Sequence, residues 1–116
     1  MFPTQITLRN MRSSPALNGR IRDLCEKLGY LHPRILTCRI AIEQATVRTK
    51  AEDATPYSVH LQIRLPEGDI AAAPQQDAEL DTALRKAFVV LRRMLRETIV
   101  AEREGLQERH LARLGG

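Results

Sequence analysis

Hydrophobic and polar residues alternate along four short stretches of the chain, and this alternation predicts β-strands. The clearest stretch is 57–65, where every second residue is apolar and polar residues stand between them. The same period recurs over 35–47 and 5–10, and a shorter stretch at 69–73 overlaps a Pro-Glu-Gly-Asp sequence typical of a turn. Successive side chains of a strand point to opposite faces, so each predicted strand has one apolar and one polar face. Residues 48–56 show no period and are predicted to form a loop.

Two further stretches carry apolar residues at spacings of three and four, which predicts amphipathic helices. The first starts at Pro15, because Ser14 suits the N-cap and proline suits the first helical position. We expect Gly29 to end it, since glycine commonly follows the last helical residue. The second covers residues 77–104, and Gly105 is expected to break it. Its core stripe is predicted to contain Leu80, Leu84, Ala87, Phe88, Leu91, Leu95 and Ile99.

The predicted elements follow one another in the order β-α-β-β-β-α. The last three strands have no helix between them, which favours an antiparallel meander. Because each strand has one apolar face, two amphipathic helices on one side suffice to cover the sheet. We therefore expect an α+β two-layer sandwich with a four-stranded sheet over residues 1–104, followed by a C-terminal tail at 105–116. The uncovered face would carry Thr7, Arg9, Arg39, Glu43, His60, Gln62 and Arg64.

The charge of the chain favours an anionic partner. Its 116 residues include 18 Lys or Arg and 14 Asp or Glu, which gives a formal net charge of +4 at pH 7. Three acidic residues, Asp77, Glu79 and Asp81, fall in the predicted first turns of the second helix, where negative charge suits the helix dipole better than it indicates acid–base chemistry. The longest apolar run, residues 87–91, is too short to cross a membrane. The first ten residues lack a run of signal-peptide length, so we expect a cytoplasmic protein.

Basic residues on the second predicted helix gather away from its core stripe. Each residue turns an α-helix by about 100°, so spacings of four and seven keep side chains close to one line. On the first helix, Arg20 and Lys27 line one flank, and side-by-side packing of the helices would join the two rows. Arginine pairs with phosphate oxygens through a planar fork, so we expect a phosphate-binding surface, with a solvated face of intrahelical ion pairs as the alternative. The basic ridge is defined as Arg20, Lys27, Arg85, Lys86, Arg92, Arg93 and Arg96, and Arg103 continues its line.

The few aromatic residues narrow the class of nucleic acid. Phe and Tyr make up only 3% of the chain, and Phe88 and Tyr57 are expected to face the core. A stacking platform for unpaired bases is therefore not expected. No Asn or Gln accompanies the arginines of the second helix, which disfavours the reading of DNA base edges. The composition favours contact with the backbone of folded RNA.

Residues that could carry chemistry form no catalytic or metal-binding set. His32, His60 and His110 lack ligand spacing, no glycine-rich phosphate loop is present, and no serine stands in a nucleophile-elbow context. We expect no enzymatic activity, cofactor, metal or small-molecule substrate. Cys25 and Cys38 fall on apolar faces and are expected to be buried free thiols. Their spacing leaves a disulfide open, although a cytosolic protein rarely keeps one.

Short matches in the order of the chain carry a family resemblance. Together they span about residues 5–97. They are Pro15-Ala16-Leu17, Lys27-Leu28, Arg34-Ile35, Gly68-Asp69-Ile70 with Ala72, and Ala83-Leu84 with Leu91, Arg93 and Leu95. In this order they resemble the short ribosome hibernation-promoting factors and ribosome-associated inhibitors, also known as sigma-54 modulation or S30EA-like ribosomal proteins. The order β-α-β-β-β-α is that family's order.

The resemblance implies a non-enzymatic function. Proteins of this family bind the small ribosomal subunit between its head and body, cover the sites of messenger and transfer RNA, and so idle the ribosome under stress. Their helices meet ribosomal RNA through basic side chains. Lys27 and Arg93 match basic positions of the family, and Arg92 and Arg96 lie beside them. The resemblance implies no cofactor, and it leaves a homodimer open.

The sequence departs from the family at three positions on the second helix. Val90 stands where the family usually has a lysine, and Glu97 replaces another basic residue. Asp81 replaces the tyrosine of the motif that opens the helix. These departures motivate an alternative hypothesis, in which a divergent paralogue acts as a protein–protein regulatory module.

Overall fold

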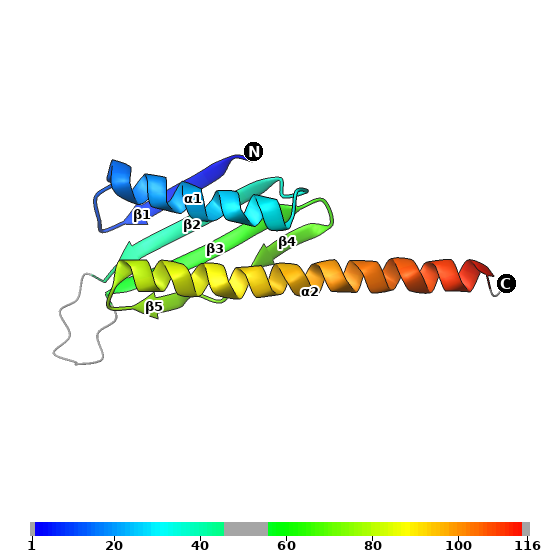
Figure 1. The fold of residues 1–116 in the computed structure, drawn as a ribbon. Coiled ribbons are helices and arrows are strands. Elements are labelled where there is room, and N and C mark those ends of the chain that lie inside the picture. Colours follow the sequence, from blue (N-terminus) through cyan, green and yellow to red (C-terminus); the bar gives the residue numbers. More distant parts are fainter. Residues whose placement is uncertain (1, 46–55, 115–116) are drawn as a thin grey trace.

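The computed structural model describes residues 2–45 and 56–114, with side chains described up to Ala101 (Figure 1). The predicted loop at 48–56 lies, except for Pro56, outside the described residues. The elements are β1 (Thr4–Arg9), α1 (Pro15–Leu31), β2 (Thr37–Gln44), β3 (Tyr57–Leu65), β4 (Gly68–Ala71), β5 (Gln75–Asp77) and α2 (Leu80–Leu114). Both helices cover one face of the sheet, which confirms the predicted two-layer α+β architecture (Figure 1).

The sheet is mixed and has β3 at its centre. Its strand order is β1-β2-β3-β4, with β1 parallel to β2 and the other pairs antiparallel. The row through the middle of the sheet joins Ile6, Ile40 and Leu61. The expected meander of the later strands is therefore present. A fifth strand, β5, pairs with the first residues of β3, while β4 pairs with its last residues.

Strand β3 shows how the alternating pattern becomes structure. Val59, Leu61 and Ile63 are buried against the helices, whereas His60 and Arg64 point into solvent. A two-residue turn then returns the chain to β4, where Gly68 pairs with Leu65 at a φ of 142°. Residues with a Cβ rarely adopt this backbone conformation, so the turn requires glycine.

Helix α1 begins at the residue that the sequence predicts. Ser14 adopts an extended backbone, and its side-chain oxygen accepts a hydrogen bond from the N–H of Leu17 at 3.1 Å. Pro15 takes the first helical position, where it needs no hydrogen-bond donor. The cap satisfies one of the amide groups that the first turn leaves without an intrahelical partner.

The prediction that Gly29 ends α1 is wrong. The helix continues to Leu31, and the N–H of His32 donates to the carbonyl of Leu28 at 2.9 Å. A Cβ at position 29 would lie 3.1 Å from the ring of Phe2, so the glycine makes room for the N-terminal segment. One internal glycine costs only about 1 kcal/mol relative to alanine, which packing can offset. Helix α1 ends instead at Leu31, with His32 as its C-cap. Pro33 follows, and a proline disfavours the helical conformation of the residue before it.

Helix α2 starts later and extends further than predicted. It begins at Leu80, so of the three predicted acidic residues only Asp81 lies in its first turn. Asp77 belongs to β5 and Glu79 precedes the helix, because pairing with β3 keeps the preceding residues extended. The helix also continues past Gly105, so the expected break there is wrong. It has 35 residues and is about 52 Å long.

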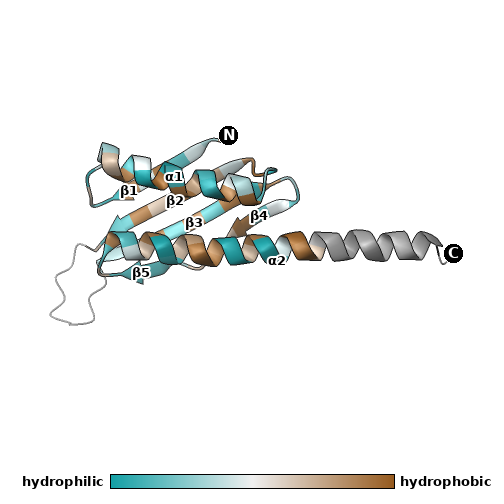
Figure 2. Ribbon diagram, viewed as in Figure 1, coloured by the Kyte–Doolittle hydropathy of each residue, from teal (hydrophilic) through white to brown (hydrophobic). Residues whose placement is uncertain are grey.

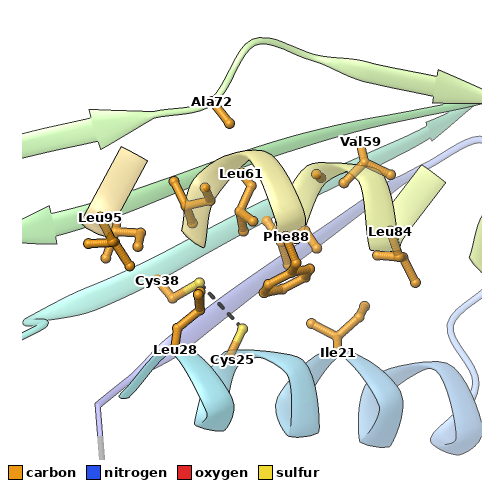
Figure 3. Packing of buried hydrophobic residues seen from close by; sticks show 14 of the residues in the cluster. Ile21, Cys25, Leu28, Cys38, Val59, Leu61, Ala72, Leu84, Phe88 and Leu95 are labelled. Atoms are coloured by element: carbon orange, nitrogen blue, oxygen red, sulfur yellow. Dashed lines mark hydrogen bonds between the residues drawn. The ribbon is translucent and has the colours of Figure 1, made fainter. Parts of the chain in front are cut away.

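The core lies between the sheet and the two helices. Side chains of α1 point toward α2 and the inner sheet face (Figure 3). Apolar and polar residues are interspersed along the coloured part of α2, as in an amphipathic helix with apolar residues at spacings of three and four (Figure 2). Leu80 and Ile99 of the predicted stripe are only partly buried, and Phe88 is buried as predicted. The largest fully buried side chains are Ile21, Leu28, Ile40, Ile42, Leu61, Ile63, Leu84, Leu91, Leu95, Val59, Cys25 and Cys38.

No helix of the described residues covers the opposite face of the sheet. Six of the seven polar side chains predicted to line it are exposed, and Gln62 is half-buried. Gln62 and Arg64 both bind the carboxylate of Asp69 on β4, at 3.0 and 3.4 Å. Within the described part of the chain, no helix has the length and apolar character needed to cross a membrane.

Candidate nucleic-acid interface

The basic ridge contains cations held by carboxylates and cations without a partner among the described residues. Arg92, Arg93 and Arg96 are exposed on α2, and Lys27 is exposed on α1. Among the described residues, none of these four side chains has an ion-pair or hydrogen-bond partner. Their charges are therefore available to an external anion. Arg103, which continues the row, lies beyond the described side chains.

Asp81 joins the basic residues of the two helices. Its Oδ1 accepts a hydrogen bond from Nε of Arg20 at 3.2 Å, and its Oδ2 lies 2.9 Å from Nη2 of Arg85. One carboxylate thus bridges α1 and α2 at the end where both helices begin (Figure 1). The structure therefore places Arg20 beside the row on α2, as side-by-side packing of the helices predicted.

The bridge also changes the proton affinity of the carboxylate. The hydrogen bond from Arg20 and the positive charges of Arg20 and Arg85 hold the pKa of Asp81 below its usual range. Asp81 is therefore ionised at neutral pH and offsets one positive charge at this end of the basic ridge. All three side chains are about half exposed, so solvent screens the contacts.

Lys86 lies on the other flank of α2. Its Nζ is 2.7 Å from Oδ2 of Asp77 and 3.4 Å from the carbonyl oxygen of Gln76. The pKa of Asp77 is lowered, first by the hydrogen bond from the backbone N–H of Glu79 and then by Lys86. Lys86 thus links α2 to β5, on the side of the helix that faces away from α1 (Figure 1). Because its charge is paired with Asp77, Lys86 differs from the cations of the basic ridge that lack a partner in the described part of the chain.

The remaining members of the basic ridge follow the helix axes. Arg20 and Lys27 are seven residues apart on α1, as are Arg85 and Arg92 on α2. Seven residues make two turns, or about 10 Å along a helix. Figure 1 shows that α1 and α2 start at the same end of the sheet and run in the same direction. Two rows of positive charge therefore extend from the Asp81 bridge toward the far end of the sheet.

The other two departures from the family pattern also lie on α2. Val90 is half-buried and packs against the core, so it adds no polar group to the surface. Glu97 is exposed and, with Arg93, Arg96, Val100 and Ala101, lines a shallow surface depression. Its carboxylate brings a negative charge to the edge of the arginine cluster.

The exposed aromatic surface is small. Phe88 is buried and Tyr57 is half-buried against the core. Tyr30 on α1 is 82% exposed, and no other described aromatic residue is exposed to a comparable degree. One exposed ring gives no platform for several bases, so the arrangement suits phosphate contacts better than base stacking. Nor do three metal-ligating side chains come together within the part of the chain that the structure describes.

The sequence alone does not reveal that Asp81 bridges the two helices. Asp81 precedes Arg85 by four residues, a spacing that places both on one helix face, so this half of the bridge was predictable. The contact with Arg20 joins residues 61 positions apart and depends on the packing of the two helices. Lys86 likewise finds Asp77 only because β5 folds beside α2.

Comparisons with known proteins agree with this fold. The family model described as "Sigma 54 modulation protein / S30EA ribosomal protein" matches residues 4–99. The crystal structure of the Thermus thermophilus Protein Y N-terminal domain is similar, with 17% identity and a TM-score of 0.67 over 81% of this chain and 94% of that one. So is a ribosomal subunit interface protein from Coxiella burnetii, with 15% identity and a TM-score of 0.70 over 84% of this chain and 98% of that one. The curated proteins contain no match.

Proposed function

Because this chain belongs to the sigma 54 modulation protein / S30EA ribosomal protein family, we propose that it binds the small ribosomal subunit and idles the ribosome. In this proposal the protein contacts ribosomal RNA, covers the sites of messenger and transfer RNA, and works in the cytoplasm as a binding protein without catalysis. The observation that carries the proposal is the cluster of Arg92, Arg93 and Arg96, exposed and without partners among the described residues.

The chemistry of these side chains supports an RNA backbone as the ligand. A guanidinium group binds phosphate oxygens through two parallel hydrogen bonds and does not lose its charge near neutral pH. Lys27 adds a fourth free cation from α1. Each phosphate contact releases counterions and adds about 0.7–0.9 to the slope of log affinity against log salt. Four contacts give a slope of roughly −3, so binding should weaken strongly with salt.

Sedimentation through sucrose gradients tests the proposal. The wild-type protein should migrate with the small subunit at low salt and be released at high salt. The triple variant Arg92→Glu, Arg93→Glu, Arg96→Glu should stay at the top of the gradient at both salt concentrations. Its melting temperature should change little, because all three side chains are exposed.

A second triple variant provides the matched control. Arg9→Glu, Arg12→Glu and Arg39→Glu change exposed arginines outside the basic ridge. Both triple variants move the formal net charge from +4 to −2, because each exchange removes two units. Retained subunit binding by the control and loss by the ridge variant would locate the interface on α2. Equal loss in both variants would mean that binding follows net charge alone and would contradict the assigned surface.

Another outcome would favour the alternative hypothesis. If the wild-type protein fails to sediment with the small subunit even at low salt, the proposal is wrong. Recovery of one specific protein partner without ribosomal RNA would then support a protein–protein regulatory module.

A further inference from the structure

Two cysteines from different elements meet in the core. Cys25 lies on the inner face of α1 and Cys38 on β2, with relative exposures of 2% and 0%. Their sulfur atoms are 3.3 Å apart and share a hydrogen bond, and both thiols are free (Figure 3). A disulfide bond is about 2.0 Å long, so the sulfurs would have to approach by roughly 1.3 Å to become bonded.

One of the two thiols faces a cavity. A hollow of about 510 Å³ lies between the N-terminal segment, the second half of α1 and the residues that precede β2. Cys25 contributes to its wall, together with Thr4, Arg22 and Tyr30, whereas Cys38 does not line it. The hollow reaches the surface, since Tyr30 is 82% exposed. Of the two thiols, Cys25 is therefore the one at a cavity wall, where a molecule of the size of hydrogen peroxide would meet it first.

The surroundings also give the two thiols different acidities. The hydrogen bond with Cys38 lowers the pKa of Cys25, and Thr4 and the charge of Arg22 lower it further. The same hydrogen bond and burial raise the pKa of Cys38. The thiolate is the reactive form of cysteine, and reactive cysteines lie in accessible, electropositive surroundings. By both criteria Cys25 is the thiol that an oxidant attacks first, while Cys38 keeps its proton.

We propose that Cys25 and Cys38 form a peroxide-reactive pair, which hydrogen peroxide converts into an intramolecular disulfide between α1 and β2. The thiolate of Cys25 attacks one peroxide oxygen and breaks the O–O bond, which leaves a sulfenic acid on Cys25 and releases a hydroxide that takes up a proton. The sulfur of Cys38 then attacks Cys25, loses its proton and expels the hydroxyl group as water. The sulfur pair loses two electrons and the peroxide becomes two waters.

The proposed reaction is independent of ribosome binding. The disulfide would fasten the middle of α1 to the sheet, between Arg20 and Lys27 of the basic ridge. It would be reversible by thiol reductants, as expected of a transient disulfide in a reducing compartment. The folded reduced protein is the reactant, because the fold brings together sulfurs that lie 13 residues apart in the chain.

Mass spectrometry of the intact protein tests the proposal. The reduced wild-type protein is treated with hydrogen peroxide, freed of peroxide, alkylated with N-ethylmaleimide in denaturant so that buried thiols react, and mapped by peptide digestion. The expected product has lost two hydrogen atoms, carries no alkyl group, links Cys25 to Cys38 and reverts with dithiothreitol. Circular dichroism should show that it keeps its fold. Two alkylated thiols after peroxide treatment, or a disulfide only between chains, would overturn the proposal.

Single variants assign the order of attack. In Cys38→Ala, Cys25 should accumulate as a sulfenic acid that dimedone traps, whereas Cys25→Ala should lose dimedone labelling altogether. Labelling of Cys38 in Cys25→Ala at the wild-type rate would refute the assigned roles. Either substitution removes a buried side chain and could unfold the protein. If one variant misfolds, dimedone labelling of the other still tests the assigned order. Arg22→Gln should slow disulfide formation in the otherwise wild-type protein, and Arg12→Gln, also exposed but outside the cavity wall, should not.

Discussion

Replacement of Asp81 by asparagine should strengthen RNA binding and make it more sensitive to salt. The carboxylate oxygens of Asp81 lie 3.2 Å from Nε of Arg20 and 2.9 Å from Nη2 of Arg85. Asp81 therefore keeps these two cations of the basic ridge from binding phosphate. Asparagine has nearly the same size and no charge, and it releases both guanidinium groups. Two additional phosphate contacts steepen the log–log salt slope by about 1.4–1.8. Between about 50 and 200 mM salt, the variant should lose roughly 7- to 12-fold more affinity than the wild type.

The assay is a titration of small ribosomal subunits with labelled protein at several salt concentrations. Asp23→Asn is the matched control, because Asp23 is exposed on α1 and has no ion pair among the described residues. It changes the net charge by the same unit. If Asp81→Asn and Asp23→Asn give the same slope, Asp81 does not withhold Arg20 and Arg85 from RNA. A lower affinity of Asp81→Asn would mean instead that the bridge positions the arginines for binding.

Four further predictions concern stability. Ser14→Ala removes the N-cap of α1 and should lower the free energy of unfolding by about 1 kcal/mol in a urea titration. Ser13→Ala loses only an exposed side-chain contact and should cost less than about 0.5 kcal/mol; similar losses would contradict the capping role. Gly19→Ala should raise the free energy of unfolding by about 0.5–1 kcal/mol, since the added Cβ meets no atom within 4 Å in the helix. Gly68→Ala should instead lower it by about 1 kcal/mol or more, because of its φ of 142°, and a gain there would refute the backbone argument. The folded-state pKa of Asp77 lies below the ordinary value, so its stabilising effect is complete above the ordinary pKa and is lost as pH falls through the lowered one. Between about pH 5 and 2, urea midpoints of the wild type should fall more than those of Asp77→Asn, and parallel curves would contradict this assignment.

The elements with a strong hydrophobic period could be predicted from sequence. Strand β3 has the predicted bounds, because its alternation extends over its whole length and one face is buried. Ser14 with Pro15 located the start of α1, since capping depends on residues next to each other in the chain. These are cases in which the local preference and the packing of the fold agree.

The errors lie where packing overrides a local signal. Gly29 and Gly105 resemble helix ends in the sequence, yet a glycine costs only about 1 kcal/mol inside a helix, and both helices continue past them. The three residues of β5 are too few and too polar to show a period of two, and only pairing with β3 reveals them. The Asp81 bridge and the contact between Cys25 and Cys38 each join two separate elements. Composition and periodicity describe single segments and therefore cannot predict these contacts.

The parallel pairing of β1 with β2 constrains the order in which this chain can fold. Strands β3 and β4 are joined by two residues, and β2 pairs with β3 in the antiparallel sense. Strands β1 and β2 are parallel, with Thr4 opposite Cys38, and α1 connects them. Strand β1 can therefore pair with β2 only once α1 has crossed over the sheet. Closing a longer loop costs more entropy, and distant contacts form more slowly than local ones. We therefore expect the meander to assemble first and β1 with α1 to dock last. Cys25 and Cys38 would then meet only in the final step, so their disulfide would mark chains that have completed folding.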